Sequence, residues 1–176
     1  MESTFRITEL GEAGAAERLN AAAEPDVRRM LAAALDVPRW IEHMVGHLPY
    51  EDDDELRRAV FAAAAPLTTD EIDRALDVHP RIGERPEGDD DHARSARAEQ
   101  AGLDMSATDV RRRLRDGNIA YERRFDRVFL VRAAGRSIDD IVDMLERRLG
   151  NEPDVEERVV ERELREIAAV RLAKVS

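Results

Sequence analysis

The stretch "PDVRRMLAAALDVPRWIEHMVGHLP", residues 25–49, decides the fold class. Proline fits the first turn of a helix but stops a helix elsewhere, so Pro25 and Pro38 each open a helix and Pro49 ends the second one. The residues between them are rich in alanine, leucine and arginine, which favour helix. The stretch therefore predicts two helices in direct succession.

The same punctuation continues after Pro49. Acidic residues open the segment 52–65, which suits the positive end of the helix dipole, and Pro66 ends it. Thr68 or Thr69 can cap the helix that follows, because a hydroxyl accepts a hydrogen bond from an unpaired N–H of the first turn. These signals predict two further helices before residue 79.

The loop "DVHPRIGERPEGDD", residues 77–90, separates these helices from a second helical series. Ser106 makes a start similar to a capping box, Ser137 caps a later helix that Gly150 closes, and Pro153 opens the last helix. The predicted helices cover residues 91–103, 107–125, 138–149 and 153–174.

The one β-leaning run, "RVFLVRAAG" at residues 127–135, is short. The chain has no internal repeat and no long linker. The prediction is an all-α fold, a single compact domain of about eight helices that spans residues 1–176.

Composition restricts the partners of this chain. Its 176 residues are 43% hydrophobic and 38% charged, with a formal net charge of −11. A chain of this charge is repelled by nucleic acid and by anionic membranes, so we expect neither as a partner.

The absence of cysteine excludes disulfides, thiolate catalysis and cysteine-ligated metals. The start "MESTFRITEL" does not resemble a secretory signal, and no apolar run approaches the roughly 20 residues of a membrane span. We therefore expect a soluble cytoplasmic protein.

His79 stands directly before Pro80, which disfavours helical geometry at position 79. The helix is predicted to end there, with the imidazole projecting from a rigid corner. With an ordinary pKa of about 6.5, a histidine suits proton transfer at cellular pH. The residues alone leave two interpretations, an ordinary loop histidine and a catalytic acid or base.

Arg171 lies on a helix face where packing favours apolar residues. Val160, Leu164 and Ile167 form an apolar stripe with helical spacing. Arg171 follows four residues later on the same face. Such an arginine either extends its charged end to solvent or meets an anion.

Glu99 presents the same pattern, because it shares a helix face with Ala96 and Leu103. Gln100 flanks that face. Both can belong to a solvated helix edge. A buried carboxylate would instead have a raised pKa and could carry protons near neutral pH.

His43 and His47 have the four-residue spacing of metal ligands on a helix. The glutamate of the zinc-protease motif is missing between them, and no third ligand is evident. The acids at residues 89–91 beside His92 indicate a solvated loop. We therefore expect no metal, although a metal-binding helical protein remains an alternative.

The chain resembles the 2-oxo-4-hydroxy-4-carboxy-5-ureidoimidazoline (OHCU) decarboxylases, which act between urate and allantoin. The resemblance lies in several short segments that follow one another in the same order as in that family. The likeness includes a twenty-residue step from His79 to Glu99. The segments are "RW" at 39–40, "HPRIGE" at 79–84, "EQAG" at 99–102, "YERRF" at 121–125, "VFLVRAAGRS" at 128–137, "ERRLGNEPDVE" at 146–156 and "EIAAVRL" at 166–172.

The resemblance implies an all-helical, usually homodimeric enzyme that works without a metal or an organic cofactor. It implies that His79 is the catalytic acid or base and that Pro80 shapes the pocket. Glu99 and Gln100 would hold the substrate and tune His79, and Arg171 would lie near the substrate carboxylate or ring oxygens.

The resemblance also implies that backbone groups of one segment contact the ring and ureido groups of the substrate. These are the groups of Val131, Arg132, Ala133, Ala134 and Gly135.

Two positions depart from the family pattern. Ala96 stands where the family commonly has serine, which removes one hydroxyl from the substrate site, and Ser95 lies one step earlier. Asp126 stands where the family favours glycine; aspartate tolerates unusual backbone angles less easily than glycine does. The missing serine leaves open a different class of function, a non-catalytic helical interaction protein with a decayed pocket.

Overall fold

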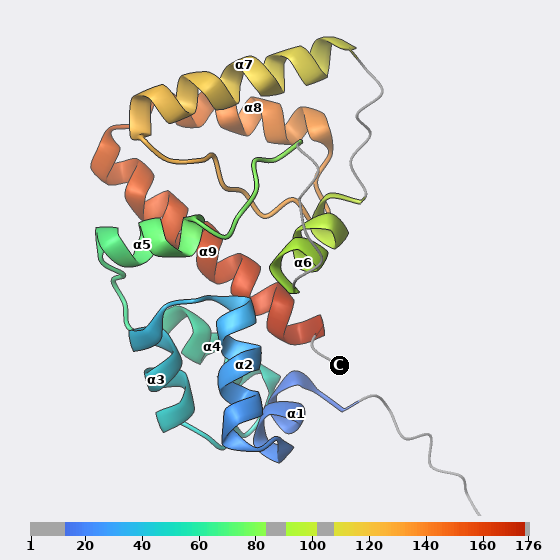
Figure 1. The fold of residues 1–176 in the computed structure, drawn as a ribbon, viewed down its shortest axis with the longest axis vertical. Helices are drawn as coiled ribbons and strands as arrows, with labels where there is room; N and C mark the ends of the chain where they lie inside the picture. The colour runs from blue at the N-terminus through green and yellow to red at the C-terminus, as the bar shows by residue number, and fades with distance from the viewer. Residues whose placement is uncertain (1–12, 84–90, 102–107, 175–176) are drawn as a thin grey trace, which may run out of the picture.

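The computed structural model describes residues 13–83, 91–101 and 108–174, apart from the side chains of residues 91–93, 96 and 99. This part of the chain folds into nine helices and contains no strand, so the all-α prediction is confirmed (Figure 1). The helices are α1 (Ala15–Ala21), α2 (Glu24–Ala34), α3 (Pro38–Gly46), α4 (Asp53–Ala62), α5 (Thr69–Leu76), α6 (Asp91–Gln100), α7 (Thr108–Phe125), α8 (Ile138–Arg148) and α9 (Pro153–Lys174).

Of the two predicted caps Thr68 and Thr69, Thr68 is the one that begins α5, and the predicted helix start at Ser137 is confirmed. Thr68 and Ser137 each form a capping box, with Glu71 and Asp140 as the respective reciprocal partners. Each box pairs two N–H groups that the first turn of a helix leaves without an intrahelical acceptor. The Ser106 start lies outside the described residues.

Helix α1 was not predicted, and a distant residue explains its presence. Seven residues are too few for a stable isolated helix. Here Asp53, the first residue of α4, accepts a hydrogen bond from the N–H of Ala16 through Oδ1 at 2.7 Å. Ala15, Ala16 and Leu19 are buried. Tertiary contacts therefore hold this helix.

Two apolar cores lie on either side of the chain segment that follows α5. The large core is built from α1 to α5 and most of α9, with Trp40 among its fully buried side chains. The small core lies between α7, α8 and the connector of residues 126–137. Helix α9 runs obliquely from the α7–α8 pair to α1 and α2, so it connects the region of the small core with that of the large core (Figure 1).

The connector between α7 and α8 contains neither helix nor strand. Asp126 begins it with a φ of 54°, so this aspartate adopts the left-handed conformation for which glycine is better suited. Gly135 has a φ of 77° and makes the turn before Ser137. The chain thus enters and leaves the connector through two residues with positive φ.

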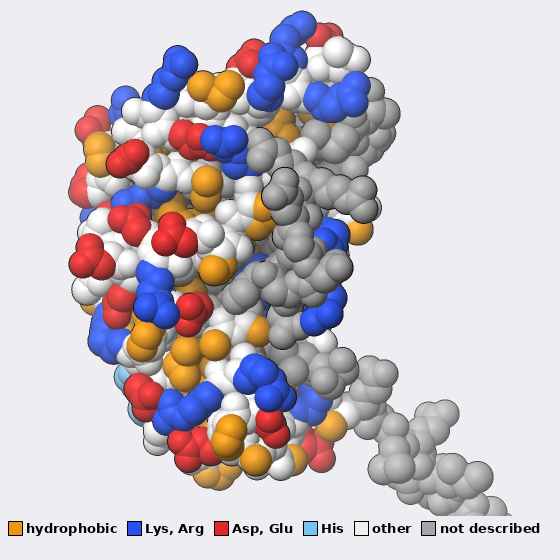
Figure 2. All heavy atoms as spheres, viewed as in Figure 1, with side chains coloured by type: hydrophobic (Ala, Val, Ile, Leu, Met, Phe, Trp, Pro, Cys, Tyr) orange, Lys and Arg blue, Asp and Glu red, His pale blue; other side chains and the backbone are white. Residues whose placement is uncertain are grey.

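The surface mixes charges of both signs. Figure 2 shows acidic and basic side chains interspersed over the visible face. Exposed ion pairs such as Arg28 with Glu42 and Arg113 with Glu146 each contribute little to stability. Among the described helices, none is both long and apolar enough to cross a membrane.

Candidate active site

His79 lies just beyond the end of α5 and is buried, with 8% of its surface exposed. Its backbone N–H donates to the carbonyl of Leu76 at 2.9 Å. Its ring nitrogen Nδ1 lies 2.7 Å from the carbonyl oxygen of Ala75. A carbonyl only accepts, so Nδ1 carries a proton, and in the neutral ring the basic lone pair is on Nε2. The last turn of α5 therefore fixes both the position and the tautomer of this histidine.

A small cavity lies against His79, where α5, α6, α9 and the connector meet. Its volume is about 20 Å³, which is room for one water molecule. Apolar side chains make up most of the wall, so a charge within the cavity is poorly hydrated. The lining residues are His79, Pro80, Ile82, Gln100, Phe129, Leu130, Val131, Ala133 and Ile167.

The structure thus brings together five of the predicted site residues. His79 and Pro80 come from the corner after α5, and Gln100 comes from the end of α6. Val131 and Ala133 come from the connector. The roles of these residues stay predictions, but their common position in one cavity agrees with a shared site.

Gln100 connects the end of α6 to the segment that follows His79 and Pro80. Its side-chain oxygen Oε1 accepts a hydrogen bond from the N–H of Gly83 at 3.0 Å. On the other side, the buried amide of Asn118 in α7 donates to the carbonyl of Ile82 at 3.2 Å. Gly83 itself has a φ of 88°. Both bonds hold the chain directly after His79 and Pro80.

Of the other predicted site residues, those with described side chains, Arg132, Ala134, Gly135 and Arg171, do not line this cavity. Arg132 turns its guanidinium to the carbonyl of Ala134 at 3.1 Å, and Gly135 lies in the following turn. Arg171, for which the sequence left open a solvent-directed or an anion-bound side chain, is buried and donates to the carbonyl of Ala33 at 3.4 Å. It lies four residues beyond Ile167 on α9. The Glu99 and Ala96 side chains lie outside the described residues.

A buried ionic cluster, which was not predicted from the sequence, lies under the connector. The Glu156 carboxylate, 1% exposed, accepts from the Tyr121 hydroxyl at 2.5 Å and from Asn151 at 2.7 Å. Arg148 donates to the same carboxylate through Nε at 2.7 Å and stacks over the Phe129 ring at 4.6 Å. Burial raises the pKa of Tyr121 well above its ordinary value, which keeps the hydroxyl protonated as the donor.

The sequence carried a signal for this cluster. Leu145 follows Ile141 by four residues, and Arg148 follows Leu145 by three. Glu156 precedes Val160 by four residues. Both charges therefore continue apolar stripes, which is the pattern that singled out Arg171. The sequences of α8 and α9 therefore already indicate that these two charges face the interior.

His43 and His47 have structural partners. The Nδ1 of His43 accepts from the N–H of Ala64 at 3.1 Å, and the Nδ1 of His47 donates to the carbonyl of His43 at 2.7 Å. Ala64 has a φ of 52°, so His43 steadies a strained turn. No group of three potential metal ligands occurs within the described parts of the chain.

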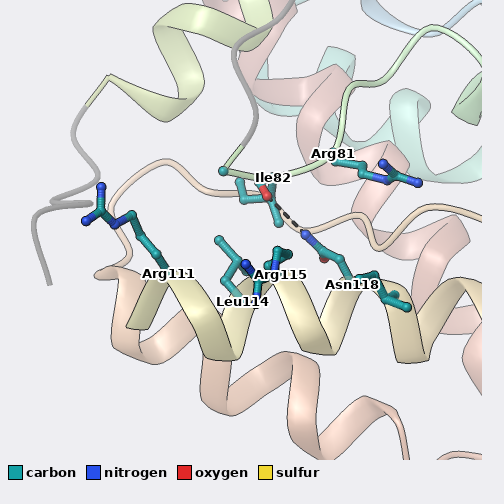
Figure 3. A pocket seen from close by; sticks show the side chains of 8 residues that line it. Arg81, Ile82, Arg111, Leu114, Arg115 and Asn118 are labelled. Atoms are coloured by element: carbon teal, nitrogen blue, oxygen red, sulfur yellow. Dashed lines mark hydrogen bonds between the residues drawn. The ribbon is translucent and has the colours of Figure 1, made fainter. Parts of the chain in front are cut away.

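A second cavity of about 420 Å³ opens beside Ile82, between the corner and α7 (Figure 3). Arg111 and Arg115 of α7 lie at this cavity, together with Arg81, which is paired with Glu122. Arg115 is paired with its neighbour Asp116. The cavity adjoins the His79 site through Ile82 but does not contain the histidine.

Comparison with known proteins extends the likeness to most of the chain. A curated 2-oxo-4-hydroxy-4-carboxy-5-ureidoimidazoline decarboxylase of Haloferax volcanii is 32% identical over 137 residues, which cover 77% of this chain and 80% of that protein. The uric acid degradation bifunctional protein TTL of Arabidopsis thaliana is 29% identical over 103 residues, 57% of this chain and 32% of that protein.

Solved structures share the fold. A crystal structure of an OHCU decarboxylase in the presence of (S)-allantoin superposes with a TM-score of 0.65 at 19% identity, and covers 87% of this chain and 97% of that one. A crystal structure of (S)-allantoin synthase gives 0.66 at 18% identity, over 89% of this chain and 52% of that one. The OHCU decarboxylase family model matches residues 20–173. This chain therefore belongs to the OHCU decarboxylase family.

Proposed function

We propose that this chain decarboxylates 2-oxo-4-hydroxy-4-carboxy-5-ureidoimidazoline to (S)-allantoin in urate degradation, with His79 as the acid or base. One observation carries the residue assignment. His79 is buried in a mainly apolar cavity, and the Ala75 carbonyl fixes its tautomer at 2.7 Å. Family membership supports the reaction class, which is that of a carboxy-lyase.

The chemistry uses only groups that the substrate and the protein already supply. The substrate name implies a C=N bond next to the carbon that bears both carboxylate and hydroxyl. When CO₂ leaves, the electron pair of the broken C–C bond moves into that C=N bond. A proton delivered to one face then gives a single enantiomer. No cofactor is required in this scheme.

His79 has the geometry for proton transfer. With its proton on Nδ1, the neutral ring can accept the substrate hydroxyl proton at Nε2 and return a proton later. General acid–base help of this kind contributes about 10²–10⁴-fold, and positioning contributes much of the remainder.

The proposal also assigns substrate-binding roles to the other residues of the candidate site. Gln100 and Glu99 hold the substrate, and Glu99 tunes His79. Arg171 supplies the positive charge for the carboxylate. The other substrate-binding groups are Pro80, Ala96, Val131, Arg132, Ala133, Ala134 and Gly135. The cavity volume of about 20 Å³ is far below that of the substrate. Binding therefore requires that these walls separate or that the site extends beyond them.

We also propose that the chain acts as a single domain, as a homodimer and in the cytoplasm, with the small molecule as its ligand. The acidic net charge of −11 supports the absence of nucleic acid and of anionic membrane partners. Light scattering coupled to gel filtration tests the dimer: a monomeric mass at micromolar concentration contradicts it.

The decisive experiment follows allantoin chirality by circular dichroism after the protein is mixed with freshly generated substrate. The wild type should rapidly form one enantiomer. His79→Ala should lower the rate by about 10²–10⁴-fold, the loss expected of a general acid or base. The control is His47→Ala, which removes an exposed imidazole directly after α3 and should leave the rate unchanged.

Near-normal turnover by a folded His79→Ala protein would remove the role of His79. If the wild type itself does not accelerate the reaction, the alternative gains support: a non-catalytic helical interaction protein. Ala96, in place of the serine common in the family, is the feature that favours this alternative.

A further inference from the structure

The connector beside His79 has an alternating arrangement although it contains no strand. The side chains of Phe129, Val131 and Ala133 belong to the small core, whereas that of Leu130 belongs to the large core. In an extended chain, successive side chains point to opposite faces and successive peptide groups to opposite edges. The segment is therefore extended from Phe129 to Ala133.

Two charged side chains bind one edge of this segment. Arg148 of α8 donates through Nη1 to the carbonyl of Leu130 at 2.7 Å. Glu163 of α9 accepts from the N–H of Arg132 at 2.7 Å through Oε2. The two bonded residues are two apart, so their peptide groups lie on the same edge. That edge is directed towards α8 and α9.

The residue between them has the opposite orientation. Val131 is buried, and its N–H and C=O make no hydrogen bond to any group in the described part of the chain. Buried peptide groups are normally paired, because an unpaired one loses the free energy of a hydrogen bond. Val131 lines the same cavity as His79.

We infer that Glu163 and Arg148 are positioning residues that bind one edge of the connector so that the peptide groups of Val131 face the His79 cavity and remain available to the substrate. This inference rests on the proposed function. Neither residue lines the cavity, so each acts through the segment it holds. A substrate with ring and ureido N–H and C=O groups is complementary to one peptide donor and one peptide acceptor.

Glu163 provides the sharper test because it is only partly buried and makes a single hydrogen bond to the connector. Glu163→Ala should raise KM about tenfold, the loss expected of one or two misaligned hydrogen bonds, and change kcat much less. His79→Ala should instead lower kcat. Loss of folded protein alone would lower the apparent kcat and leave KM unchanged.

Two matched variants distinguish the loss of the hydrogen-bond acceptor for the Arg132 N–H from the loss of a negative charge on α9. Glu163→Gln keeps an oxygen acceptor for the Arg132 N–H and should restore most of the affinity. Glu166→Ala removes a carboxylate three residues further along α9, where it is paired with Arg57, and should behave as the wild type. An unchanged KM in a folded Glu163→Ala protein overturns the inference for Glu163, as does an equal rise in KM for Glu163→Gln.

Arg148→Lys tests the other bond. Lysine keeps the charge beside Glu156 but has no planar fork to reach the Leu130 carbonyl at the same time. KM should again rise more than kcat falls. An unchanged KM in a folded Arg148→Lys protein overturns the assignment of Arg148.

Hydrogen exchange measured by mass spectrometry tests the inference without reference to activity. Peptides that cover residues 129–133 should exchange faster in Glu163→Ala than in Glu166→Ala. If the wild type lacks decarboxylase activity and exchange still differs, the proposed function fails while the positioning role stands. Equal exchange in the two variants overturns the positioning role.

Discussion

Two buried arginines, one beside each core, donate hydrogen bonds to backbone carbonyls of neighbouring segments. In the large core, Arg165 is 3% exposed and donates to the carbonyls of Val60 and Ala63 at 2.9 and 2.8 Å. In the small core, Arg148 is 5% exposed and donates to the carbonyl of Leu130. The chemistry is the same, but the chain segments held are different.

Arg165 completes a helix that already has its own hydrogen bonds. Val60 lies in the last turn of α4, and Ala63 is the residue that ends it. Carbonyls at a helix end always need partners from outside the helix. Arg148 instead holds a segment with neither helix nor strand. In the small core, side-chain hydrogen bonds therefore replace the regular backbone hydrogen bonds that the connector lacks.

The largest predicted effect is on the free energy of unfolding when the small-core arginine is removed. Arg148→Met should cost about 3–5 kcal/mol, because it leaves the Glu156 carboxylate buried and unpaired. Urea unfolding measures this cost. The double variant Arg148→Met with Glu156→Leu should recover much of it. A double variant less stable than the single one would contradict this explanation.

A smaller effect is expected for Arg165→Met, about 1–3 kcal/mol, because the Ala63 carbonyl loses its arginine donor whereas the Val60 carbonyl keeps the Trp40 indole N–H at 3.1 Å. Its partner Glu161 is 15% exposed, so water can hydrate the carboxylate once the arginine is gone. The variant should also keep the KM of the wild type, since Arg165 does not hold the connector. An equal loss in the free energy of unfolding for Arg165→Met and Arg148→Met would contradict this difference between the two cores.

The two capping boxes provide a matched pair with a still smaller effect. Thr68→Ala and Ser137→Ala should each cost about 1 kcal/mol, the usual loss of a helix cap. In a chain of this length this lowers Tm by roughly 2–4 °C, which calorimetry resolves. Only Ser137 ends the connector, so only Ser137→Ala should also raise KM. An equal KM in both variants would show that the cap does not affect the site.

The smallest effect concerns acid stability. The Arg39 guanidinium and the Thr68 N–H lower the pKa of Glu71 to about 2 from an ordinary 4.5. A lowered pKa stabilises the folded state above pH 4.5, and this contribution is lost as the pH falls towards 2. Glu71→Gln should therefore flatten the fall in Tm over that range. Asp140→Asn is the control, because Asp140 makes no such bond to an arginine; equal flattening would contradict the role of Arg39.

Most of the helical framework could be predicted because its signals are local. Pro38 and Pro153 begin the helices they were expected to begin, and α7 continues through Gly117 as predicted. Gly150 follows the end of α8 but does not adopt positive φ, so it is not a left-handed cap. Helix α1 was missed because Asp53, far away in the sequence, caps it.

The site could be predicted only in part. His79 and Gln100, which line the same cavity, were singled out because a proline restraint and a helical face are visible in the sequence, and their roles stay predictions. The pairing of Glu163 with the N–H of Arg132 could not be found, since it depends on how α9 crosses the connector. Sequence spacing defines faces within one helix, but it does not state which distant segment a face will meet.

The position of α9 in the chain has a consequence for protein synthesis. Its residues Pro153–Lys174 include Glu156 under the small core, Glu163 at the connector and Ile167 in the cavity wall. All the other described helices precede α9 in the chain. While the ribosome is still producing α9, the nascent chain has neither a finished cavity nor a covered apolar face on α2 and α4. The newly made protein should therefore need protection from aggregation until its last described helix has emerged.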